Sequence, residues 1–121
     1  MTIDEAIAWA DALRPNTFTR EHKLRWLSEL DGKLYLEVVK THESAFAPYP
    51  PRYESGEEEL LVSEPYGESL YYHYLQAMVA AENGENQRYN RRMTLFNSAL
   101  ADWTNWVNRS RRPCARGAFR F

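Results

Sequence analysis

The sequence predicts an all-α protein, a small helical bundle of about four helices with a long antiparallel C-terminal helix hairpin. Along most of the chain, apolar residues recur in steps of three and four, the spacing that places side chains on one helix face. Proline or glycine punctuates most of the boundaries between these segments. A length of 121 residues and a hydrophobic content of 44% suffice for one domain with its own core. We therefore expect a helical domain over residues 1–112 and a basic, flexible tail over 113–121.

The longest predicted helix covers residues 85–112 and contains no proline. Its large apolar residues form one stripe, which predicts that the other helices bury this face. The stripe consists of Tyr89, Met93, Phe96, Leu100, Trp103 and Val107.

The first predicted helix begins at Thr2, whose side chain, with Glu5 three residues later, has the spacing of a capping box. The helix ends at Arg14-Pro15-Asn16. Trp9 lies off the apolar face; both a core position and a partner contact are open for it, with the edge of the core favoured. The expected core face is Ile3, Ile7, Ala10 and Leu13, with Ala6 beside them.

The second predicted helix is capped by Thr19 and runs to about Thr41. Gly32 lies inside it, where either a close helix–helix contact or a break is conceivable. We expect a continuous helix, because the apolar period stays in phase across the glycine. Its expected core residues are Leu24, Leu27, Leu30, Leu34, Tyr35 and Val38.

The segment 44–64 has no helical period and forms the extended loop between the second and third helices. It contains a proline-aromatic run at 47–53, three consecutive glutamates and then Leu60-Leu61-Val62, which could form a short strand. Solvated linkers rarely carry so many aromatic residues, so an ordered or partner-ordered interaction loop is favoured over a floppy one.

The third predicted helix begins near Pro65 and runs to about Glu82. Asn83-Gly84 then reverses the chain, which makes the third and fourth helices an antiparallel hairpin. Tyr72 is the tyrosine expected to point outward, where it would suit a protein partner. The face expected to be buried is Leu70, Tyr74, Ala77 and Ala81, flanked by Tyr71, Leu75 and Met78.

Charge divides the chain into an acidic body and a basic end. Residues 1–108 hold 10 Lys and Arg and all 17 Asp and Glu, a net charge of −7. Residues 109–121 hold five arginines and no acid, a net charge of +5. This asymmetry suggests electrostatic docking, including onto another copy of the chain.

The residues typical of enzymes do not converge in this sequence. Cys114, the only cysteine, falls in the predicted tail, and the three histidines lie on separate segments without metal-ligand spacing. We therefore predict no catalytic, cofactor-binding or metal-binding residues and no enzymatic activity.

No apolar run approaches the length of a membrane span. Sequence-specific DNA binding is disfavoured because the folded body is acidic, despite Arg88, Arg91 and Arg92.

Two stretches of the chain resemble a known family. The first includes Asp4-Glu5-Ala6-Ile7, Arg14-Pro15-Asn16, residues 23–32 and Glu37-Val38-Val39. The second includes Tyr72, Tyr74-Leu75, Ala77, Asn83-Gly84-Glu85, Arg88-Tyr89-Asn90, Phe96-Asn97, Trp106 and Asn108-Arg109. Together they resemble the head-tail connector, or adaptor, proteins of tailed phages and prophages over most of residues 3–113, apart from the 44–64 loop.

The resemblance implies a non-catalytic virion protein that is assembled in the host bacterial cytoplasm during head completion and tail attachment. It would form a ring under the portal, binding itself, the portal protein and a tail-side head-completion protein. DNA would pass through the channel without sequence-specific binding, and no membrane is involved. The alternative is a prophage or bacterial regulatory protein that binds a single protein partner through its helix hairpin. The predicted interaction residues are Phe46, Tyr49, Tyr53, Tyr72, Arg109, Arg111, Arg112, Arg116, Phe119, Arg120 and Phe121.

Overall fold

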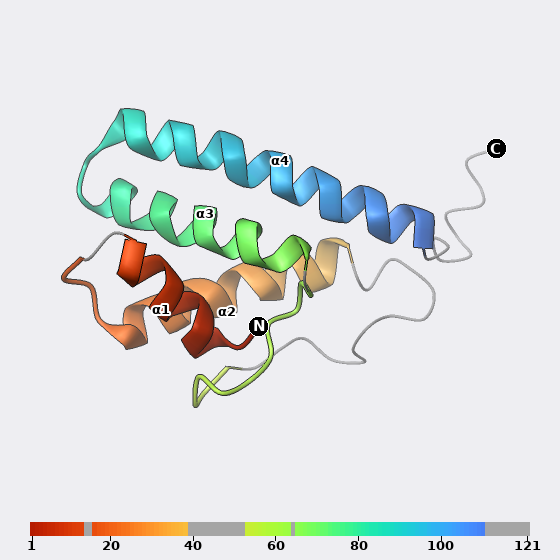
Figure 1. The fold of residues 1–121 in the computed structure, drawn as a ribbon, viewed down its shortest axis with the longest axis horizontal. Helices are drawn as coiled ribbons and strands as arrows, with labels where there is room; N and C mark the ends of the chain where they lie inside the picture. The colour runs from red at the N-terminus through yellow and green to blue at the C-terminus, as the bar shows by residue number, and fades with distance from the viewer. Residues whose placement is uncertain (14–15, 39–52, 64, 111–121) are drawn as a thin grey trace.

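The computed structural model describes residues 1–13, 16–38, 53–63 and 65–110. Within these ranges four helices follow one another, and their arrangement is shown in Figure 1. They are α1 (Ile3–Leu13), α2 (Arg20–Glu37), α3 (Tyr66–Glu82) and α4 (Asn86–Ser110). The predicted all-α bundle with a C-terminal hairpin is thereby confirmed. Across the described ranges, none of these helices combines the length and apolarity needed to cross a bilayer.

Helix α1 begins with the predicted capping box. The backbone N–H of Glu5 donates to Oγ1 of Thr2 at 3.2 Å, and the N–H of Thr2 donates to Oε1 of Glu5 at 2.8 Å. The core face consists of Ile3, Ala6, Ile7 and Ala10. Leu13, predicted to belong to it, is 58% exposed instead.

Helix α2 begins after Thr19, whose Oγ1 accepts a hydrogen bond from the N–H of His22 at 3.2 Å. It continues through Gly32 as predicted, and no neighbouring atom lies within 4 Å of where a Cβ would stand there. The predicted end near Thr41 was too late: the helix ends at Glu37, where β-branched Val38 takes the C-cap position. Leu27, Leu30, Leu34 and Tyr35 are buried as expected, whereas Leu24 and Val38 are half-buried.

Helix α3 is the centre of the bundle, since α1, α2 and α4 all pack against it. It therefore buries more than the one face predicted for it. Gln76, Val79 and Ala80 are buried in addition to residues of the predicted face and its flanks, namely Leu70, Tyr71, Leu75 and Ala77. Two members of the predicted face differ: Tyr74 is half-buried and Ala81 is exposed.

Helices α3 and α4 form the predicted antiparallel hairpin, joined through Gly84, whose φ of 74° suits a residue without a side chain. Phe96, Trp103 and Val107 of the α4 stripe are buried. The remaining stripe residues, Tyr89, Met93 and Leu100, are only half-buried. The expectation that the whole stripe is buried was therefore too strong, because α4 packs mainly on α3 and its flanks stay open.

The segment 53–63 packs against the bundle. Its Leu60 and Val62 belong to the core. The possible strand at 60–62 does not form; in the described segment only an isolated bridge joins Thr2 to Glu59. The N–H of Ile3 donates to the carbonyl of Glu58 at 3.2 Å, and the N–H of Leu60 donates to the carbonyl of Met1 at 3.1 Å. These bonds tie the second half of the predicted loop to the start of α1.

Candidate functional site

The predicted interaction residues fall into two groups. Tyr53, Tyr72 and Arg109 lie in the described part of the chain, on three different elements that do not form one site. The others lie outside the described residues, namely Phe46, Tyr49, Arg111, Arg112, Arg116, Phe119, Arg120 and Phe121.

Tyr53 is a core residue, which corrects its prediction as a contact to another subunit. It is 9% exposed, and its hydroxyl donates a hydrogen bond to Oδ2 of Asp31 in the middle of α2. The same oxygen accepts a hydrogen bond from the N–H of Leu61 at 3.1 Å. The aromatic character that suggested a partner contact serves here to hold the 53–63 segment on the bundle.

Asp31 is fully buried and accepts hydrogen bonds on both carboxylate oxygens. Its Oδ1 accepts from the hydroxyl of Tyr71 at 2.7 Å, and that hydroxyl accepts from the N–H of Val62 at 2.8 Å. The network therefore joins α2, α3 and the 53–63 segment in the interior. Buried polar groups require such partners, so this network fixes how the three elements fit together.

Burial sets the protonation chemistry of this network. It raises the pKa of Asp31 above the ordinary 3.8, while the three donated hydrogen bonds act in the opposite direction. Burial and the nearby Asp31 carboxylate raise the pKa of Tyr53 and Tyr71, so both hydroxyls keep their protons and remain donors.

Tyr72 lies on α3 facing α4, half-buried rather than fully outward as predicted. The guanidinium carbon of Arg92 lies 5.1 Å from the centre of its ring, a cation–π arrangement. The same guanidinium lies 3.3 Å from Nδ1 of His73, and burial and the Arg92 charge lower the pKa of that histidine. Tyr72 thus helps to hold the hairpin together and offers only part of its ring to a partner.

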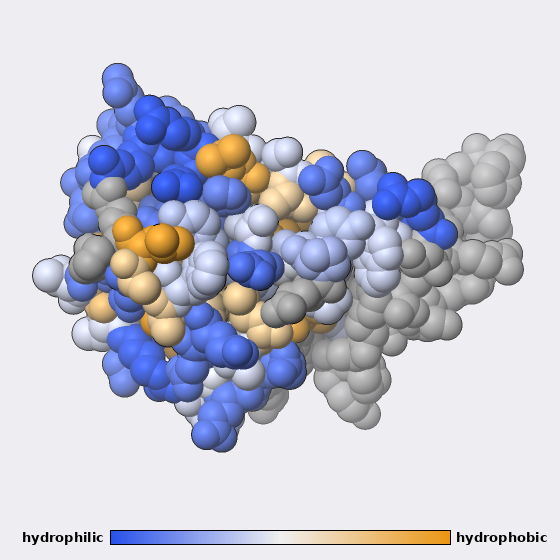
Figure 2. All heavy atoms as spheres, in the orientation of Figure 1, coloured by the Kyte–Doolittle hydropathy of each residue, from blue (hydrophilic) through white to orange (hydrophobic). Residues whose placement is uncertain are grey.

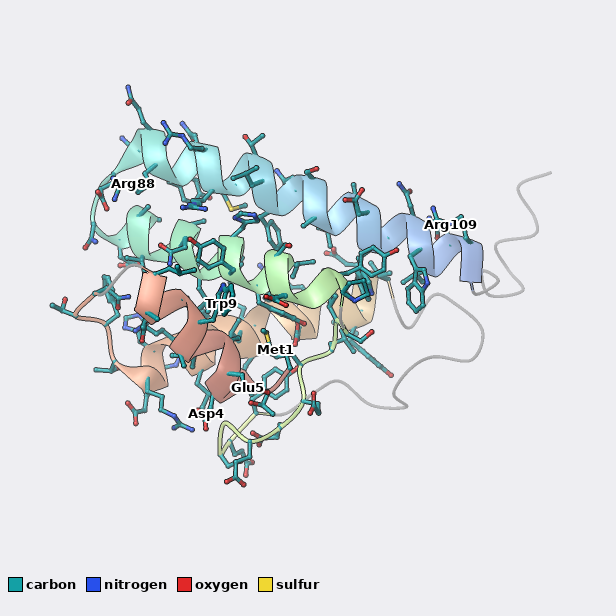
Figure 3. All side chains as sticks on the ribbon, in the orientation of Figure 1. Met1, Asp4, Glu5, Trp9, Arg88 and Arg109 are labelled. Atoms are coloured by element: carbon teal, nitrogen blue, oxygen red, sulfur yellow. The ribbon has the colours of Figure 1, made fainter. Side chains whose placement is uncertain are left out.

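The arginines at the two ends of α4 differ in their surroundings. At its start, Arg88 lies 3.4 Å from Glu85 in an ion pair, and Arg92 packs on Tyr72. Arg91 is exposed there, beside a shallow surface hollow. Arg109 is exposed in the last turn of α4, where the basic end of the chain begins. Figure 3 shows Arg88 and Arg109 at opposite ends of this helix.

The outer face of α1 is the clearest candidate contact surface, because large apolar side chains stand in solvent there. Trp9 is 47% exposed and Leu13 is 58% exposed, one helical turn apart. Ala8 and Ala12 are exposed beside them. The favoured expectation for Trp9, the edge of the core, was wrong. We call Trp9, Leu13, Ala8 and Ala12 the α1 ridge.

An acidic turn packs against the first turn of α1, on the side of the helix start from the α1 ridge. Glu54, Glu57 and Glu59 are exposed on this turn, and Asp4 and Glu5 lie nearby on α1. The turn is held in shape by Glu58, whose carboxylate accepts from the backbone N–H groups of Glu54 at 2.8 Å, Ser55 at 3.2 Å and Gly56 at 2.8 Å. These donors lower the pKa of Glu58 to about 2.

The other buried polar side chains also join elements to one another. Lys23 of α2, 3% exposed, lies 2.8 Å from Oδ1 of Asp11 on α1. Gln76 of α3 donates to the carbonyl of Ala10 at 2.9 Å. No group of three or more His, Cys, Asp or Glu side chains within the described ranges could hold a metal ion.

Sequence reasoning missed the Asp31 network and the exposed α1 ridge. Asp31 lies within the apolar stripe of α2, three residues before Leu34. A carboxylate at such a position indicates a buried acid that needs hydrogen-bond donors. For the α1 ridge the signal was composition: apart from Asp4, Glu5 and Asp11 every residue of α1 is apolar, and Trp9 lies off the predicted core face. Leu13, by contrast, was predicted to belong to that face. Comparisons with protein-family models, curated proteins and solved structures found no significant match.

Proposed function

We propose that this protein is a structural adaptor of a tailed-phage virion, a head-tail connector that assembles as a ring under the portal. Its partners are other copies of itself, the portal protein and a tail-side head-completion protein, and it is assembled in the bacterial host cytoplasm. Support comes from the residue patterns along 3–113 that resemble connector proteins and from the all-α bundle with its long terminal hairpin.

The observation that carries the proposal is the exposure of large apolar side chains on three different helices. Trp9 and Leu13 stand on α1, Leu36 on α2 is 54% exposed, and Leu95 on α4 is 41% exposed. Figure 2 shows hydrophobic residues in separate places on the visible face, with hydrophilic residues between them. A subunit of a ring needs two different contact surfaces, because each copy touches one neighbour on each side. A protein that binds one partner needs a single surface.

The buried polar groups support a non-catalytic role. The side chains of Asp31, Lys23 and Gln76 each form hydrogen bonds to a different element of the fold, at the distances given above. Buried bonds between elements suit a building block, whose surfaces must keep their geometry through assembly.

The charge distribution agrees with DNA passing the protein without being held. Strong DNA binding requires cationic surfaces that displace counterions from phosphates. Here residues 1–108 carry a net charge of −7, and two of the arginines near the start of α4, Arg88 and Arg92, make contacts within the fold. A subunit body of net negative charge would attract DNA weakly, which suits DNA that passes through a channel.

Deletion of the coding sequence from a phage or prophage that carries it tests the function. An adaptor should leave DNA-filled or leaking heads and separate tails in electron micrographs, and supply of the intact protein should restore tailed particles. Normal tailed particles with an altered time of lysis or altered gene expression would contradict the proposal and favour a regulatory protein.

A further inference from the structure

We propose that the α1 ridge is the docking surface for the basic end of a second copy of this chain, residues 109–121. This inference rests on the proposed ring assembly, because it assigns one of the contacts between neighbouring subunits.

The α1 ridge has the shape and chemistry of a short peptide-binding strip. Trp9 and Leu13 are four residues apart and stack along one line of the helix, with Glu5 one turn before Trp9. Ala8 and Ala12 lie beside them, and their short side chains do not project above the helix surface. Aromatic and aliphatic residues that stand in water on a helix with a completed core face are typical of contact surfaces.

Carboxylates lie beyond one end of this strip, toward the start of α1. The N–H of Asp4 donates to the carbonyl of Gly56 at 3.0 Å, which fixes the acidic turn against the first turn of α1. Helix α1 carries no lysine or arginine within Ile3–Leu13. The acids of this area are Asp4, Glu5, Glu54, Glu57 and Glu59. Two of them are partly offset, because Arg20 lies 2.9 Å from Asp4 and the amino group of Met1 lies 3.1 Å from Glu59.

The basic end of the chain carries the complementary groups. Residues 109–121 contain five arginines, two phenylalanines and no acid. Arginine pairs well with carboxylates, and Phe119 and Phe121 supply the apolar surface that Trp9 and Leu13 would cover. Charge would bring the segment to the acidic turn, and ring contacts on the strip would then hold it.

The geometry of the fold favours the tail of a neighbour over the chain's own. Helix α4 packs mainly on α3, whereas α1 packs on α2 and α3. Figure 1 shows the end of α4 at one extremity of the long axis, with α1 in the other half of the molecule. A ring of identical subunits would bring the α4 end of one copy toward a different surface of the next.

Site-directed cross-linking between two differently labelled copies tests this inference, with Cys114 as a natural probe in the tail. One copy carries Ala12→Cys and Cys114→Ser, and the other keeps only Cys114. In the matched control, the first copy carries Ala101→Cys with Cys114→Ser, since Ala101 is also an exposed helix alanine. A short bis-maleimide linker is applied with the portal protein present, and ring formation is followed in the same samples by native mass spectrometry.

We expect a covalent heterodimer through Ala12→Cys, several-fold more abundant than through Ala101→Cys. It should be lost when Trp9→Ala and Leu13→Ala are added or when the salt concentration is high. Rings that form without this excess would overturn the docking site and leave the adaptor function standing. Absence of both rings and heterodimer would overturn both. In a single chain with Ala12→Cys and Cys114, an intramolecular link in place of the heterodimer would overturn the choice of a second copy.

Discussion

The hydroxyl of Tyr71 on α3 donates a hydrogen bond to Oδ1 of Asp31 on α2 at 2.7 Å, although 40 positions separate the two residues in the chain. The same hydroxyl accepts a hydrogen bond from the N–H of Val62. One oxygen atom thereby joins two helices and the 53–63 segment, and it does so in a fully buried position.

Tyr71→Phe is expected to destabilise the protein more than Tyr53→Phe. Loss of the Tyr71 hydroxyl leaves the buried N–H of Val62 without this acceptor, at a cost of about 1–3 kcal/mol in addition to the lost bond to Asp31. Loss of the Tyr53 hydroxyl leaves Oδ2 of Asp31 still bonded to the N–H of Leu61. Urea unfolding of both variants measures the difference, and an equal or larger loss for Tyr53→Phe would contradict the described roles.

Asp31→Asn should reveal a pH dependence with a defined sign. Because burial raises the folded-state pKa of Asp31 above 3.8, its contribution to stability is fully present below 3.8 and is lost as pH rises through the raised value. The unfolding free energy of the wild type relative to Asp31→Asn should therefore fall as pH rises from below 3.8 to neutrality. A relative stability that grows with pH would show that the hydrogen bonds outweigh burial.

Glu58→Gln provides the opposite case within the same series. The pKa of Glu58 falls from 4.5 to about 2, because backbone N–H groups bind its carboxylate. Its contribution to stability is therefore present above 4.5 and is lost as pH falls toward about 2. As the pH falls, the difference in unfolding free energy between the wild type and Glu58→Gln should shrink. The difference between the wild type and Asp31→Asn should grow over the same pH range. If both differences changed in the same direction, one of the two pKa assignments would be wrong.

Two helix glycines should respond to alanine in opposite directions. No atom beyond the adjoining helix backbone lies within 4 Å of a Cβ at Gly32, so Gly32→Ala should stabilise α2 by about 0.5–1 kcal/mol. A Cβ at Gly67 would stand 2.3 Å from the backbone oxygen of Val62, so Gly67→Ala should cost about 1–3 kcal/mol. Thermal unfolding of both variants compares them. Stabilisation by Gly67→Ala would show that the 53–63 segment does not cross α3 this closely.

Phe96→Ala should cost about 3–5 kcal/mol, as is usual for a core phenylalanine. Phe96 is 5% exposed and its ring centre lies 5.3 Å from that of Tyr74 on α3. The neighbouring Leu95→Ala is the control, since Leu95 is 41% exposed and should lose less than about 1 kcal/mol. Similar losses in chemical denaturation would mean that α4 faces α3 with a different side.

Local signals in the sequence predicted the helices well. Helix boundaries depend on interactions between residues a few positions apart, so they can be predicted without knowledge of the fold. Examples are Thr2 with Glu5, Thr19, and Asn83-Gly84. The end of α2 was misplaced because helical period alone cannot show where tertiary packing stops supporting a helix.

Long-range relationships were harder to predict. The partners of Asp31 lie 22 to 40 positions away, so no local pattern could reveal that Tyr53 belongs to the core. Exposure of Trp9 depends on which helices pack beside α1, and that is set by the whole bundle. Aromatic character alone therefore could not show that Tyr53 is buried and that Trp9 is exposed.

The central claim, ring assembly as an adaptor, is tested most directly by co-expressing this chain with the portal protein of the same phage and imaging the purified particles by electron microscopy. We predict a closed ring of this chain seated on the portal ring, with Trp9→Ala and Leu13→Ala together reducing its occupancy. Portal particles without this chain, while the chain elutes separately as a monomer or dimer, would contradict the proposed function.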